Sequence, residues 1–86
     1  MLGCTVLDAH ASGIPGQPDV IVGCMGTNHL VEYKNLKTAY GRSGLSQSQA
    51  DFARHWNGGP VYVVTCTDDV VELVHLWRVR TGKVML

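Results

Sequence analysis

Apolar residues fall in short runs separated by glycine, proline and small polar residues, a pattern typical of β-strands joined by turns. We expect strands at residues 4–7, 20–23, 29–34 and 60–66. The run 20–23 does not alternate with polar residues, which predicts a strand buried on both faces. Residues 25–28 predict the turn of an antiparallel hairpin, and the glycine- and proline-rich residues 12–18 predict the loop before it.

Two later segments carry apolar residues at helical spacing. The first helix is expected to begin at Ser46, because Ser46 and Gln49 form the S-x-x-Q pattern of a capping box. Its apolar stripe, which includes Phe52, is expected to pack on the sheet. Residues 57–60 contain two glycines and a proline and predict its end.

The second helix is expected to follow Thr67, which is predicted to cap it, and to reach Trp77. Asp68 and Asp69 lie in its first turn, where negative charge is favourable against the helix dipole. This helix is apolar over more than one face, so either the sheet covers it widely or a second subunit does. Residues 79–86 are predicted to return as a short extended segment.

The 86 residues indicate one small domain spanning residues 1–86, with a formal net charge of zero. The apolar runs are far shorter than the ~20 residues of a membrane span. The first residues lack the basic and apolar regions of a signal peptide, so we expect a soluble protein of the cytoplasm, with no membrane partner. Cys4, Cys24 and Cys66 are odd in number and lack CxxC spacing, which argues against a disulfide framework and a zinc site.

Three charged residues mark the ends of the predicted hairpin strands. Asp19 follows Pro18, Glu32 lies thirteen positions later, and Lys34 lies two residues beyond Glu32. Because side chains alternate across a strand, Glu32 and Lys34 project to one face while Tyr33 projects to the other. Paired strands lie about 4.8 Å apart, so Asp19 and Glu32 can meet at one divalent cation. Two carboxylates and one ammonium suit the metal-dependent hydrolysis of a phosphodiester.

These residues, in this order and followed by Gln49, resemble the PD-(D/E)xK nuclease superfamily, and more narrowly the small VRR-NUC type found alone in phages and prophages. The resemblance covers about residues 3–77, through the segments 13–23, 29–34, 45–49 and 60–64. It implies a restriction-endonuclease-like α/β core, with a mixed, mainly antiparallel sheet of about four strands and two packed helices. The family's usual order opens with a further helix that often carries another acidic residue. That opening helix is expected to be missing or truncated here: either the chain dispenses with it, a partner supplies it, or the natural protein begins further upstream.

The resemblance also implies an endonuclease that hydrolyses DNA with Mg²⁺ or Mn²⁺. Asp19 and Glu32 would ligate the metal together with the backbone carbonyl of Tyr33. Lys34 would orient or deprotonate the attacking water, or stabilise the charge that develops on the phosphate. Gln49 would position Lys34 or the water. Hard oxygen ligands of this kind argue against zinc.

Residues 35–44 show no clean periodicity and are predicted to form a loop, which at this length in a small domain is commonly functional. Lys37, Tyr40 and Arg42 lie in this loop without an acidic neighbour, so we expect them to contact nucleic acid. His10, shortly before the glycine-rich loop, is a further candidate for such a contact. A solvated loop without this role would have the same sequence pattern.

Each site residue also has a purely structural interpretation. Asp19 could cap the turn after Pro18, and Gln49 could serve only the capping box. Glu32 and Lys34 could be solvated charges on an edge strand. We expect their strand to be central instead, where charged side chains are costly unless they serve a site.

Two alternatives remain for the function as a whole. One is a non-catalytic nucleic-acid-binding or assembly protein with a vestigial nuclease site, which the neutral net charge favours. The other is the catalytic module of a larger nuclease.

A small core and a widely apolar helix predict a homodimer. Stand-alone members of the resembled family are associated with junction resolution, so the resemblance implies branched DNA, such as a Holliday junction, as substrate.

Overall fold

A computed structural model describes residues 3–9 and 13–81 of the chain. Within these residues the elements follow in the order β1 (Cys4–Asp8), β2 (Val20–Cys24), β3 (Thr27–Tyr33), α1 (Ala39–Arg42), α2 (Gln47–His55), β4 (Val61–Val64) and α3 (Thr67–Thr81). The protein is thus a small α/β fold with a four-stranded mixed sheet and three helices among its described residues. No helix in the described part of the chain is long and apolar enough to cross a membrane.

The strands lie in the sheet in chain order, β1-β2-β3-β4. β2 pairs antiparallel with β1 and with β3, whereas β3 and β4 are parallel. β3 is therefore a central strand, as predicted. The predicted hairpin is formed by β2 and β3, but its turn contains only Met25 and Gly26. Both residues have positive φ, as a type I′ turn requires, so the paired strands extend to Cys24 and Thr27.

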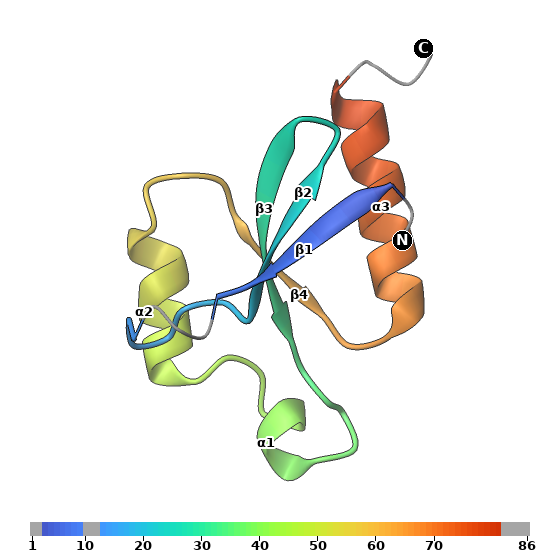
Figure 1. Cartoon of the computed structure of the whole chain (residues 1–86). Helices are drawn as coiled ribbons and strands as arrows, with labels where there is room; N and C mark the ends of the chain where they lie inside the picture. Colours follow the sequence, from blue (N-terminus) through green and yellow to red (C-terminus); the bar gives the residue numbers. More distant parts are fainter. Residues whose placement is uncertain (1–2, 10–12, 82–86) are drawn as a thin grey trace.

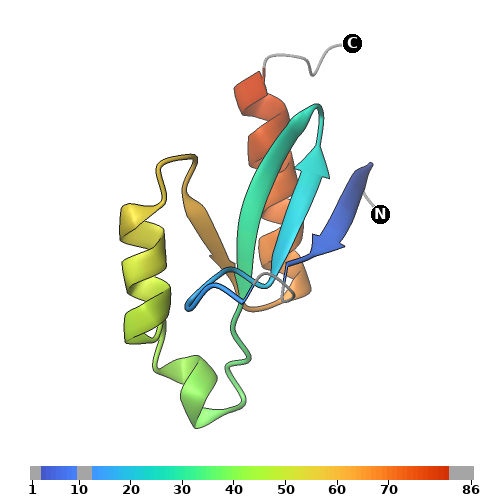
Figure 2. The ribbon, with the colours of Figure 1, turned by 60° about the vertical axis from the view of Figure 1, so that its left-hand side comes forward.

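Helices cover the sheet on both sides, with α2 on one side and α3 on the other (Figure 1). The side facing α3 holds the buried apolar cluster, which consists of Cys24, Val31, Val64, Val74 and Trp77. From the end of β3 the chain passes through α1 before it reaches α2 (Figure 2). The end of β3 therefore lies where two helices can supply side chains to it.

The loop predicted at residues 35–44 contains the short helix α1, so the expectation of two helices was wrong by one. Apolar periodicity could not reveal it, because α1 has four residues and includes a glycine. Local hydrogen bonds form it instead. The Thr38 hydroxyl accepts a hydrogen bond from the Gly41 amide at 2.9 Å, as an N-cap does.

α3 differs from the prediction at both ends. It begins at Thr67 itself, and the carboxylate of Asp69 accepts hydrogen bonds from the amide and the hydroxyl of Thr65, both at 2.8 Å. These bonds hold the pKa of Asp69 below its usual range. The helix continues through Thr81, so the extended segment predicted from Val79 is wrong as far as Thr81, and residues 82–86 lie outside the described residues. β4 likewise ends at Val64, before the predicted residue 66.

Burial of the sheet is uneven. Val20, Ile21 and Val22 are half-buried, so the prediction of a strand buried on both faces was wrong. The neighbouring strand β1 is an edge strand with exposed apolar side chains, and it leaves β2 incompletely covered. α3 is apolar on more than one face, as predicted: Val71, Leu76 and Val79 expose 47%, 38% and 59% of their surface.

The imidazole of His29 on β3 contacts this core through Trp77. Its ring stacks on Trp77 with 3.7 Å between centroids, and the Tyr62 ring lies at 69° to it with 6.0 Å between centroids. Its Nε2 atom is buried without a hydrogen-bond partner. Burial disfavours the charged imidazolium and lowers the pKa of His29.

This environment predicts a loss of stability in mild acid. With a folded-state pKa below the unfolded value of about 6.5, His29 contributes its full stability above pH 6.5 and loses it as the pH falls through the folded-state pKa. Between pH 7.5 and pH 5 we expect the free energy of unfolding, measured with urea, to fall less in His29→Phe than in the wild type. The exposed His75→Gln serves as the control and should behave as the wild type does. An equal fall in the free energy of unfolding in His29→Phe and the wild type would show that His29 is not its cause.

Candidate functional site

Glu32 and Lys34 lie at the end of the central strand and are the two charged residues that the structure buries among those described. Only 4% of Glu32 and 3% of Lys34 is exposed. Alternation along β3 directs both to the face opposite Val31, as predicted. The Lys34 ammonium lies 4.0 Å from Oε2 of Glu32. Since buried charges are costly unless they are paired and hydrogen-bonded, the surrounding groups decide whether this strand end is stable.

Gln49 of α2 supplies those hydrogen bonds. Its Oε1 atom accepts from the Lys34 ammonium at 2.6 Å, and its Nε2 atom donates to Oε2 of Glu32 at 2.7 Å. The same Oε1 atom accepts from the Ser46 amide at 2.9 Å, which completes the predicted capping box. Capping and contact with the charged pair therefore occur together, and the donors and acceptors around the amide define its orientation.

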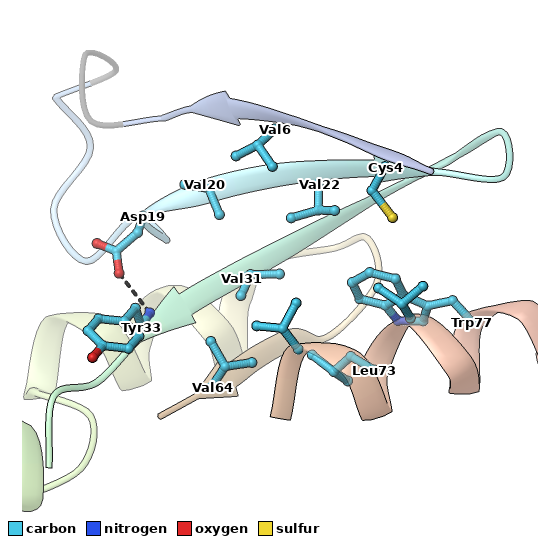
Figure 3. A pocket seen from close by; sticks show the side chains of 12 residues that line it. Cys4, Val6, Asp19, Val20, Val22, Val31, Tyr33, Val64, Leu73 and Trp77 are labelled. Carbon is cyan, nitrogen blue, oxygen red and sulfur yellow. Dashed lines mark hydrogen bonds between the residues drawn. The ribbon is translucent and has the colours of Figure 1, made fainter. Parts of the chain in front are cut away.

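Asp19 lies at the start of β2, directly after the buried Pro18. Its Oδ2 atom accepts a hydrogen bond of 2.7 Å from the amide of Tyr33, the residue between Glu32 and Lys34 (Figure 3). The pairing of β2 with β3 ends at Val20 and Val31, so on the β2 side of Tyr33 this carboxylate takes the place of a strand partner, whereas β4 pairs with Tyr33 on the other side. In a strand the amide and the carbonyl of one residue point to the same side, so the carbonyl of Tyr33 is expected on the same side of β3 as Asp19.

The loop before Asp19 packs against the start of α2. Gly16 has a φ of +76°, and a Cβ atom at this position would overlap the backbone carbonyl of Ser48. Only glycine allows this close approach without strain. The contact brings the loop that carries Asp19 and the helix that carries Gln49 to the same end of the sheet.

The predicted nucleic-acid contacts divide into three groups. The Tyr40 ring lies 4.5 Å from the Lys34 ammonium, in cation–π contact. Lys37 and Arg42 are exposed on the same segment, where the Arg42 guanidinium donates to the carbonyl of Leu36 at 3.1 Å. His10 lies outside the described residues.

An apolar hollow of about 280 Å³ lies between the sheet and α3, with Asp19 and Tyr33 at one end and Trp77 at the other (Figure 3). Its walls include Val6, Val22 and Leu73. The sequence has no signal for this hollow, because it arises from the incomplete cover of β1 and β2. The contact between Tyr40 and Lys34 likewise depends on the path of a loop that periodicity does not describe.

The donor set at this end of the sheet suits a hard cation better than zinc. Asp19, Glu32 and the Tyr33 carbonyl offer oxygen atoms, which Mg²⁺ and Mn²⁺ prefer. Cys24 lies at the opposite end of β2, next to the hairpin turn, where burial, aided by a hydrogen bond with Cys4, raises the pKa of its thiol to about 11. In the described ranges no three His, Cys, Asp or Glu side chains come together, and the predicted ligand set has two carboxylates and one backbone oxygen.

Comparison of the chain with protein-family models, with curated proteins and with solved structures found no match.

The position of Gln49 between two buried charges predicts a large stability difference between two neighbouring glutamines. Gln49→Ala leaves the charges without their shared partner and removes half of the capping box, so we expect a loss of about 2–3 kcal/mol in the free energy of unfolding. Gln47→Ala, on the exposed side of the same helix, should cost less than about 0.5 kcal/mol. Urea unfolding measures both values. Equal losses in the two variants would contradict the bridging role.

Proposed function

We propose that this chain is a Mg²⁺- or Mn²⁺-dependent DNA endonuclease with a restriction-endonuclease-like core. One observation carries the proposal: the end of the central strand holds a buried carboxylate and a buried ammonium in one hydrogen-bonded group, and a second carboxylate binds the backbone between them. A buried ion pair adds little to the stability of a strand end, because well-packed apolar residues in such places often give equal or greater stability.

Each residue has a distinct part in the proposed reaction. Asp19, Glu32 and the Tyr33 carbonyl would hold the cation, which when bound polarises the phosphate and makes its water more acidic. Lys34 provides a positive charge next to the reacting phosphate and water. Gln49 keeps the ammonium of Lys34 at a constant position relative to the Glu32 carboxylate, with hydrogen bonds of 2.6 Å and 2.7 Å.

The charge around the site supports DNA as the substrate, although the net charge of the chain is zero. Residues 33–50 contain Lys34, Lys37 and Arg42 and no acidic residue. Of these, Lys37 and Arg42 are exposed on the segment that leaves β3 and can neutralise phosphates close to the proposed cut. The neutral net charge is the observation that favours the rival function, a binding or assembly protein with an inactive site.

Conservative substitutions at the charged residues separate the two functions. We expect Asp19→Asn, Glu32→Gln and Lys34→Met each to lower the rate of plasmid cleavage in Mn²⁺ by about a hundredfold or more, because each removes one charge from the reacting group. Asp51→Asn removes an exposed carboxylate from α2 and should cleave as the wild type does. Chelation of the metal should abolish cleavage. A wild-type protein that binds DNA and does not cut it, or wild-type rates in Asp19→Asn or Glu32→Gln, would contradict the endonuclease.

We further propose a homodimer that acts on branched DNA. Leu76 and Val79 of α3 and Val63 of the edge strand β4 line an open, mainly apolar hollow that Asp69, Glu72 and His75 also border. Val63 exposes 44% of its surface. Light scattering should give twice the chain mass of 9.3 kDa, and Val79→Glu should give the monomer mass. Leu7→Glu, at the opposite edge of the sheet, is the control and should remain dimeric.

Paired, symmetric cuts are expected across a synthetic four-way junction. A wild-type monomer, or equal cutting of linear duplex, would contradict this proposal.

A further inference from the structure

The Lys34 ammonium has defined neighbours on several sides. Oε1 of Gln49 lies 2.6 Å away, Oε2 of Glu32 lies 4.0 Å away, and the centre of the Tyr40 ring lies 4.5 Å away. Lys34 is 3% exposed, whereas Tyr40 is 63% exposed. The Tyr40 ring therefore lies on the solvent side of the ammonium.

The backbone around Tyr40 is closed into a compact turn that begins at the residue next to Lys34. The carbonyl of Asn35 accepts hydrogen bonds from the amide and the hydroxyl of Thr38, at 3.1 Å and 3.0 Å. Gly41 is buried against the same residue, and a Cβ atom on Gly41 would overlap the backbone of Asn35. The position of the Tyr40 ring is thus tied to the strand end that carries Lys34, even though the ring itself is largely exposed.

We propose that Tyr40 is a positioning residue for Lys34: its ring holds the ammonium against Gln49 and Glu32 and limits its access to water. The inference rests on the proposed endonuclease function. It replaces the contact with the DNA backbone that the sequence predicts for Tyr40. A cation–π contact needs only the aromatic face, so phenylalanine should substitute for tyrosine and leucine should not.

The first test needs neither DNA nor metal. The folded protein is treated with an amine-acetylating ester, and mass spectrometry measures the rate of modification at each lysine. We expect Tyr40→Leu to raise the rate at Lys34 about tenfold, while Tyr40→Phe stays within about twofold of the wild type. Lys37 serves as the internal reference, and Leu36→Ala, which removes an exposed side chain from the same segment, as the control variant. Gly41→Ala should act as Tyr40→Leu does, because it displaces the turn with the ring intact.

The second test compares kcat with KM for DNA cleavage. Tyr40→Leu should lower kcat about tenfold with little change in KM, since the reacting charge is misplaced while the DNA contacts remain. Tyr40→Phe should restore kcat.

The outcomes separate this inference from the proposed function. An unchanged acetylation rate in Tyr40→Leu overturns the positioning role whether or not the protein cleaves DNA. A raised KM with unchanged kcat also overturns it and assigns Tyr40 to DNA contact. Faster acetylation without a fall in kcat overturns its relevance to the reaction. If the wild type does not cleave DNA and Tyr40→Leu still exposes Lys34, the endonuclease fails and the positioning of Lys34 by Tyr40 stands.

Discussion

The proposed site depends on two hydrogen bonds that the carboxamide of Gln49 makes with buried charges of opposite sign, Glu32 and Lys34. The carboxamide joins α2 to the central strand and provides both Glu32 and Lys34 with a hydrogen-bond partner away from water. The carboxylate and the ammonium themselves lie 4.0 Å apart, beyond hydrogen-bond distance, so the amide bridges them. The same amide oxygen also caps α2, so the start of the helix and the geometry of the charged pair are set by one side chain.

The rest of the fold brings further groups to this strand end from both sides. Before β2, the close approach of Gly16 to Ser48 places the loop of Asp19 beside α2, and Asp19 then binds the amide of Tyr33. After β3, the turn around Asn35 and Gly41 places Tyr40 over Lys34. The core on the α3 side is small and leaves apolar surface exposed, which is why a second subunit is part of the proposal.

The features that sequence reasoning could predict are those controlled by local periodicity. Strand alternation correctly predicted that Glu32 and Lys34 share a face, and the spacing of Ser46 and Gln49 correctly predicted the capping box. The hairpin and the central position of β3 followed from the turn residues and the apolar runs. α1 was missed because its few residues are held by Asn35 and Thr38 and not by an apolar stripe. The place of Tyr40 over Lys34 could not be predicted either, since it depends on the three-dimensional path of a loop.

The proposed binding of a divalent cation where Asp19 meets the end of β3 can be measured directly with Mn²⁺ and protein NMR. Paramagnetic Mn²⁺ broadens the amide signals of nuclei close to it. We predict that substoichiometric Mn²⁺ broadens the signals of Val20, Tyr33 and Lys34 first, and that Asp19→Asn removes this effect. Broadening that begins instead at the acidic first turn of α3, at Asp68 and Asp69, or that is unchanged in Asp19→Asn, would contradict the claim.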